Sequence, residues 1–210
     1  MTTGTPYSSR LVVDNYICQK LRRRGVAREL HPHLSNGDTP TPRNGFPPGT
    51  PGAAEAHAAL RRVLREAGDL MERRYLHEFA HLSSQVNLSP RGARGTFSAV
   101  VEELFRDDVN WGRIVAFLEF GGALCVECVN RDAPQQVECI ASWMTEYLNG
   151  PLQSWIQENG GWEAFVELYD GRTGSGSNGS WSNLRAVFSL AGLAALGAVG
   201  VTVGAYFAQK

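Results

Sequence analysis

The sequence predicts an all-α protein: a bundle of helices around a central buried hydrophobic helix hairpin, followed by a C-terminal transmembrane helix. Two observations carry this prediction. Residues 109–131 place apolar side chains on every helical face, so other helices must surround them. Residues 187–208 contain no charged side chain, and at about 1.5 Å per residue they reach roughly 33 Å, enough to cross a bilayer core.

The composition argues against several classes of function. The 210 residues allow one domain with a sizeable core and appended segments. The formal net charge of −1 argues against nucleic-acid binding, which needs a basic excess to neutralise phosphates. The first ten residues lack the apolar stretch of a secretory signal, so the four cysteines are expected to be reduced in a compartment that faces the cytosol.

Neither catalysis nor metal binding is indicated. No Ser/His/Asp set or glycine-rich phosphate loop is present, so we expect no enzyme and no cofactor. Cys125 and Cys128 have the spacing of metal and redox sites, but they fall inside an apolar helix without a second pair, and we expect them to be packing residues. His77 and His81 lack the accompanying carboxylate of a zinc motif and are expected to be exposed.

The central helix at residues 109–131 has three informative exceptions to its apolar pattern. Asn110 is of a type that caps helix N-termini. Gly121 and Gly122 leave a smooth patch, at which the backbone of a neighbouring helix is expected to approach closely. Arg113 lies in the first turn, where a cation opposes the helix dipole, and a carboxylate from outside would explain its presence.

Two N-terminal segments differ sharply in composition. Residues 10–24 repeat apolar side chains at helical spacing and end in a basic cluster, which predicts a helix docked on the core; binding to a membrane surface is the alternative. Residues 31–53 are rich in Pro and Gly and poor in aliphatic side chains, which predicts a disordered loop. Its Thr39-Pro40 and Thr41-Pro42 dipeptides resemble proline-directed phosphorylation sites, although a bare linker is the simpler interpretation.

Helical periodicity returns after this loop and continues to residue 169. It predicts helices over residues 54–86, from Pro90 to about residue 105 and over 134–148, and two short helices joined at residues 160–161. Residues 171–186 are rich in Gly and Ser and read as a flexible linker.

Four segments resemble, in the expected order, the homology motifs of the Bcl-2 family of apoptosis regulators. Residues 10–25 resemble the fourth motif, and residues 64–69, LREAGD, resemble the third. The first motif is matched by NWGR at residues 110–113 with FGG at 120–122, and the second by WIQENGGW at 155–162. The resemblance covers nearly the whole chain and points to the anti-apoptotic branch.

The resemblance assigns a role to each segment. Residues 1–30 would carry an N-terminal amphipathic helix packed on the core, residues 31–53 a disordered loop, and residues 54–170 the helical core with the third, first and second motifs. Residues 171–186 would be the linker, and residues 187–208 a C-terminal tail anchor in the membrane.

The resemblance also implies a hydrophobic surface groove that binds the amphipathic BH3 helices (helices with the third homology motif) of pro-apoptotic relatives, including Bax/Bak-type effectors. Arg113 would bond an aspartate of the incoming helix bidentately, and Asn110 would add a hydrogen bond. Leu64, Gly68 and Asp69 would form part of the groove wall. The predicted groove residues are Met71, Tyr75, Glu78, Phe79, Leu82, Val100, Leu104, Asn110, Gly112, Arg113, Ala116, Phe120, Phe165 and Tyr169.

Two of these positions depart from the residue types that the resemblance leads us to expect. Met71 stands where a phenylalanine would face the groove, and Glu78 stands where a shorter acidic residue would lie at the rim. Methionine is flexible, so the set of accepted helices is expected to be wider.

The implied function is to hold pro-apoptotic helices so that the mitochondrial outer membrane stays sealed. The implied location is the mitochondrial outer membrane and the endoplasmic reticulum and nuclear envelope, with the globular part facing the cytosol and the C-terminal helix in the bilayer. A Bax/Bak-type pore former shares three of the motifs and a hydrophobic hairpin, here residues 111–148, and is the alternative.

Overall fold

The computed structural model describes residues 7–25, 51–85 and 90–170, and of residues 51–53, 74–85, 90–91 and 170 it describes the backbone alone. These residues form seven helices and no strand, which confirms the all-helical prediction for this part of the chain. The helices are α1 (Ser9–Arg23), α2 (Pro51–Gln85), α3 (Pro90–Leu104), α4 (Trp111–Asn130), α5 (Gln135–Asn149), α6 (Gln153–Glu158) and α7 (Gly161–Asp170).

The helix ends differ from the predicted ones by only a few residues. The largest difference is at α2, which begins at Pro51 and thus includes the end of the predicted 31–53 loop. The rest of that loop with its Thr-Pro pairs, the 171–186 linker and the 187–208 span lie outside the described residues. Within the described ranges, no helix combines the length and the apolar character needed to cross a membrane.

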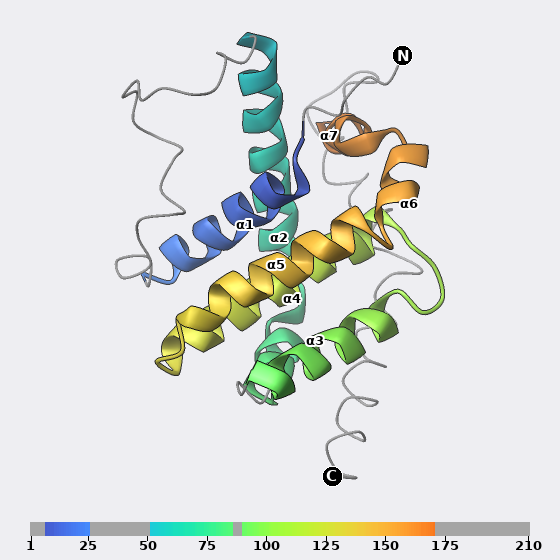
Figure 1. Cartoon of the computed structure of the whole chain (residues 1–210). Coiled ribbons are helices and arrows are strands. Elements are labelled where there is room, and N and C mark those ends of the chain that lie inside the picture. Colours follow the sequence, from blue (N-terminus) through green and yellow to red (C-terminus); the bar gives the residue numbers. More distant parts are fainter. Residues whose placement is uncertain (1–6, 26–50, 86–89, 171–210) are drawn as a thin grey trace, which may run out of the picture.

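Helix α4 is the centre of the bundle. Sixteen of its twenty residues are buried, as predicted from the apolar side chains on all of its faces. It contacts α1, α2, α3 and α5. Figure 1 shows α4 and α5 side by side across the middle of the molecule, with α3 below them and α6 and α7 beyond one end.

The hairpin of α4 and α5 is less uniformly buried than predicted. Its turn, residues 131–134, includes Asp132 with a φ of 55°. Helix α5 buries one face, formed by Val137, Ile140, Met144 and Leu148 among others, whereas Glu138 and Glu146 on its other face are exposed. Since it has a polar face, α5 can border solvent while α4 cannot.

The glycine patch on α4 is filled by side chains, not by the backbone of a neighbouring helix. A methyl group added at Gly121 would overlap the sulfur of Met144 from α5. At Gly122 it would lie 3.4 Å from Lys20 and from the Tyr16 ring, both of α1. Neighbouring helices do approach the two glycines closely, but they do so with side chains, whereas the sequence predicted the backbone of a helix.

Aromatic rings attach α3 to the hairpin. The ring of Phe97 lies 5.9 Å from that of Phe120 and 5.8 Å from that of Trp143, measured between centroids. Phe105, just after α3, stacks on Tyr147 at 5.7 Å. Such ring pairs add about 0.5–1.5 kcal/mol each beyond their burial, so they reinforce the packing of the buried Val100, Val101 and Leu104 of α3.

Glu119 is a charged residue in the middle of the buried helix, and α1 satisfies it. Its side chain is 1% exposed. One carboxylate oxygen pairs with the Lys20 ammonium, and the other accepts a hydrogen bond from the Tyr16 hydroxyl at 2.6 Å. Lys20 also pairs with Glu72 of α2 at 2.8 Å, so that one ammonium group joins α1, α2 and α4.

Three groups of this network have shifted pKa values. Burial raises the pKa of Glu119, and the Lys20 charge only partly offsets this effect. Burial and the neighbouring Glu119 raise the pKa of Tyr16. Burial also acts to raise the pKa of Glu72, but its hydrogen bonds from Lys20 and Arg24 outweigh that effect and lower it. Burial thus decides the direction of the pKa shift for Glu119 and Tyr16, whereas the cations of α1 decide it for Glu72.

We predict that Glu119→Gln destabilises the fold by about 3 kcal/mol, because it leaves a buried ammonium without its buried carboxylate. The control is Glu127→Gln on the same helix. Glu127 forms a surface pair with Arg131 at 2.6 Å, and the loss should be below about 1 kcal/mol. Urea unfolding of both variants measures the difference, and equal losses would show that the Lys20–Glu119 pair does not hold α1 to the core.

Candidate functional site

Arg113 lies at the N-terminus of α4 and is the polar centre of the candidate site. Its side chain is only 3% exposed, yet it is paired with carboxylates that reach solvent. The Nη1 atom lies 2.7 Å from Oδ1 of Asp108 and donates to the Asp108 carbonyl oxygen at 2.8 Å. The Nη2 atom lies 3.6 Å from Oδ2 of Asp107. These partners belong to the same chain, whereas the sequence predicted a carboxylate from outside.

Asn110 holds the start of α4 beside this ion pair. Its side-chain oxygen accepts a hydrogen bond from the backbone N–H of Arg113 at 2.9 Å, which confirms the predicted cap. Its side-chain amide nitrogen lies 3.5 Å from Oδ2 of Asp108. The cap therefore fixes the first turn of α4 and places the Asn110 side chain beside the ion pair of Arg113 and Asp108.

An aromatic cluster packs around Trp111 at the same end of α4. The ring of Trp111 lies 5.2 Å from that of Trp155 in α6, and 5.5 and 5.0 Å from those of Trp162 and Phe165 in α7. The first and second motif segments therefore meet in space around Trp111. Their aromatic residues set the position of the Arg113 backbone.

The described groove residues are largely buried in this conformation. Of the ten whose side chains are described, Asn110 is half-buried and the other nine are buried: Met71, Val100, Leu104, Gly112, Arg113, Ala116, Phe120, Phe165 and Tyr169. Tyr75, Glu78, Phe79 and Leu82 belong to the second half of α2, where the backbone alone is described. The groove as a whole therefore stays a prediction.

The chain's own third-motif segment faces α1 instead of the predicted groove wall. Leu64 is 3% exposed. A methyl group added at Gly68 would overlap the Tyr16 hydroxyl, and Asp69 pairs with Arg23. Since Tyr16 and Arg23 belong to α1, Gly68 and Asp69 lie at the interface between α2 and α1.

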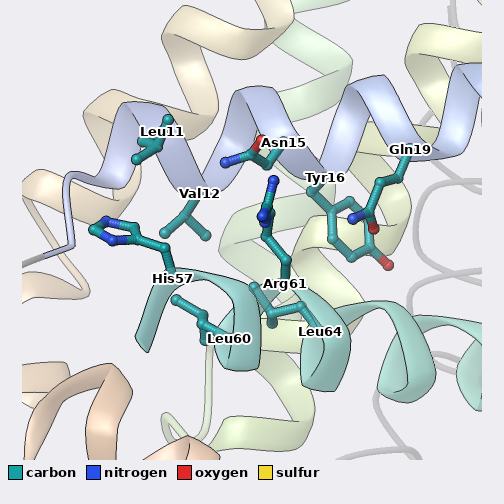
Figure 2. A pocket seen from close by; sticks show the side chains of 9 residues that line it. All are labelled: Leu11, Val12, Asn15, Tyr16, Gln19, His57, Leu60, Arg61 and Leu64. Atoms are coloured by element: carbon teal, nitrogen blue, oxygen red, sulfur yellow. The ribbon is translucent and has the colours of Figure 1, made fainter. Parts of the chain in front are cut away.

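A separate surface pocket lies on the seam between α1 and α2. Figure 2 shows Val12 and Tyr16 of α1 opposite Leu60 and Leu64 of α2, with Leu11 and His57 at one end. Its empty volume, including the open mouth, is about 300 Å³. Leu11 is 43% exposed, so this apolar seam is partly open to solvent. It lies on the face of α2 that carries Leu64, and it was not predicted from the sequence.

The cysteines of α4 have the character of core residues. Cys125 and Cys128 are both buried. Burial raises the pKa of both thiols, to about 11 for Cys128, so both are protonated at neutral pH. In the described part of the chain, no three His, Cys, Asp or Glu side chains are grouped so that they could hold a metal ion.

Asp107 and Asp108 are the site residues that sequence reasoning missed. They lie between two predicted helices, and their position just before a first-turn arginine was a signal that they could pair with it. The side chains of Asp107 and Asp108 are 64% and 49% exposed, so the buried guanidinium lies directly beneath two carboxylates at the surface. This arrangement can exchange one carboxylate for another.

Comparison with known proteins gives related sequences over most of the chain. The family model for apoptosis regulator proteins of the Bcl-2 family matches residues 64–162. The chain is 56% identical over 148 residues to "Apoptosis regulator Bcl-2" of Canis lupus familiaris, covering 70% of this chain and 61% of that protein. It is 52% identical over 169 residues to the protein of the same name from Gallus gallus, covering 80% and 68%.

A second group of relatives carries a different name. "Bcl-2-like protein 1" of Homo sapiens is 48% identical over 153 residues, which is 73% of this chain and 64% of that protein. The chain thus spans between 61% and 68% of the length of these three relatives.

Proposed function

Because this chain belongs to the Bcl-2 family of apoptosis regulators, we propose that it is an anti-apoptotic regulator that binds the BH3 helices of pro-apoptotic relatives, Bax/Bak-type effectors included, in a hydrophobic surface groove. Holding these helices would prevent permeabilisation of the mitochondrial outer membrane. The role is one of protein binding and needs no catalytic group. It is supported by the names of the relatives, two of which are apoptosis regulators.

One observation favours Arg113 as the polar anchor. Its buried guanidinium is bonded to carboxylates that are half-exposed or more, so an incoming aspartate can reach it without crossing the core. A planar guanidinium binds a carboxylate through two parallel hydrogen bonds, which fixes the direction of the bound helix. Specificity would then come from apolar pockets at helical spacing.

Binding requires the groove floor to become accessible. Val100 and Leu104 are 2% and 1% exposed, so α3 or the second half of α2 must shift before a ligand helix can touch them. Displacing α3 would break the ring contacts of Phe97 and Phe105 and expose the buried Val100 and Leu104, so the opening costs free energy. The free energy of this opening would reduce the measured affinity for every ligand equally.

We predict that Arg113→Ala weakens binding of a Bax-type BH3 peptide by at least about 2 kcal/mol, roughly thirtyfold in Kd, because the peptide carboxylate is left desolvated beside Asp108. The matched control is Arg106→Ala. Arg106 precedes the same turn and is 58% exposed, so its removal should change Kd less than about threefold. Calorimetric titration measures both.

Two results would contradict the proposal. If the folded protein bound no BH3 peptide, the groove would be absent. If the chain itself released dye from liposomes, and did not suppress the release driven by a Bax-type effector, the pore-forming alternative would replace it. Thermal unfolding of Arg113→Ala must accompany the titration, since Arg113 also bonds the Asp108 carbonyl that shapes the turn.

We also propose that residues 187–208 anchor the protein in the mitochondrial outer membrane and in the endoplasmic reticulum and nuclear envelope, behind the 171–186 linker. The absence of charge over this stretch supports the proposal. Deleting residues 187–210 should move the protein from the alkali-resistant membrane pellet to the soluble fraction. Retention of the deleted form in that pellet would contradict the anchor.

A further inference from the structure

The Arg113 site is already occupied by a carboxylate of the chain itself. Asp108 approaches Nη1 of Arg113 to 2.7 Å with its side chain, and its backbone carbonyl accepts from the same atom at 2.8 Å. At 2.7 Å the guanidinium and the Asp108 carboxylate form a close ion pair. A ligand carboxylate cannot take the same position on Nη1 while the Asp108 side chain stays there.

We propose that Asp108 is a specificity-determining residue that competes with the ligand's aspartate for Arg113. The inference rests on the proposed function, because it concerns the same groove. When a BH3 helix with an aspartate binds, one ion pair replaces another, and the net gain is small. When a helix without this aspartate binds, the Arg113–Asp108 pair is kept and nothing is lost.

The exposure of Asp108 makes this exchange possible. Its side chain is 49% exposed, so after displacement the carboxylate can return to water at little cost, whereas a buried carboxylate could not. If it stays, its charge lies beside that of the ligand, and like charges at such distances repel. Either way the ligand's aspartate contributes less to affinity than it would against an unoccupied arginine.

Asp107 differs from Asp108 and supplies the matched control. It lies 3.6 Å from Nη2 of Arg113, beyond hydrogen-bond distance, and it also faces Nε of Arg106 at 3.5 Å. Its side chain is 64% exposed, so its pairing is weak. Asp107→Asn changes the net charge as Asp108→Asn does, and it therefore separates the local exchange from a general electrostatic effect.

The consequence is a site that accepts ligand helices with or without the aspartate. In the natural chain, replacing the ligand's aspartate by alanine should cost only about threefold in Kd or less, because the exchange of ion pairs is nearly balanced. Once the Asp108 carboxylate is removed, the same replacement should cost more than tenfold, because the ligand's aspartate then meets no competing carboxylate at Nη1 of the buried Arg113. Asp108 would thus widen the set of helices that the groove accepts.

The test is a double-mutant cycle with the full chain. The probes are a Bax-type BH3 peptide and its variant with alanine in place of the aspartate that follows the motif glycine, each titrated against the natural chain, Asp108→Asn and Asp107→Asn. Asp108→Asn should tighten binding of the aspartate peptide about tenfold and leave the alanine peptide within about twofold. Asp107→Asn should change both by less than about threefold.

Every other pattern counts against the proposal. If Asp108→Asn changes the two peptides by the same factor, or changes neither, Asp108 does not compete for Arg113. If neither peptide binds any form of the protein, the proposed function fails and this inference fails with it. Asp108→Ala repeats the measurement with a second side chain and retains the bond from Arg113 to the backbone carbonyl, so a folding defect of one variant does not decide the result.

Discussion

The burial of α4 is the constraint on which the rest of the structure depends. A twenty-residue helix with sixteen buried positions has no face that can meet water, so every neighbour is placed to cover it. Helix α1 and helix α2 cover much of it, α5 returns along it, and α3 is added through aromatic contacts. The two charged residues within this buried surface, Arg113 and Glu119, must then find partners, since an unpaired buried charge is strongly unfavourable.

The two charges are satisfied in different ways, and the difference separates structure from function. Glu119 is paired in the interior by Lys20 and Tyr16 of α1, and these groups cannot leave without opening the bundle. Arg113 is paired at the end of the helix by two aspartates of the preceding turn, both in contact with water. The first arrangement holds the fold together, whereas the second can be exchanged for a carboxylate from another molecule.

The sequence was sufficient to predict the helices, because the apolar spacing of α1 to α7 has one consistent period and α4 is apolar all round. It was also sufficient to predict that Arg113 needs a carboxylate and that Asn110 caps α4. The position of Asp108 just before the first-turn arginine was a signal, but which carboxylate bonds Arg113 depends on how the turn before α4 folds. The direction of Leu64, Gly68 and Asp69 was predicted wrongly, since a helix with apolar residues on two faces does not reveal which neighbour takes which face.

The most direct test is the structure of the complex with a Bax-type BH3 peptide. The account predicts that the peptide lies as a helix between α3 and the second half of α2, with its aspartate bonded to the Arg113 guanidinium and the Asp108 side chain turned to solvent. A peptide seated in the α1–α2 pocket of Figure 2, or one bound elsewhere while the Arg113–Asp108 bond is unchanged, would contradict it.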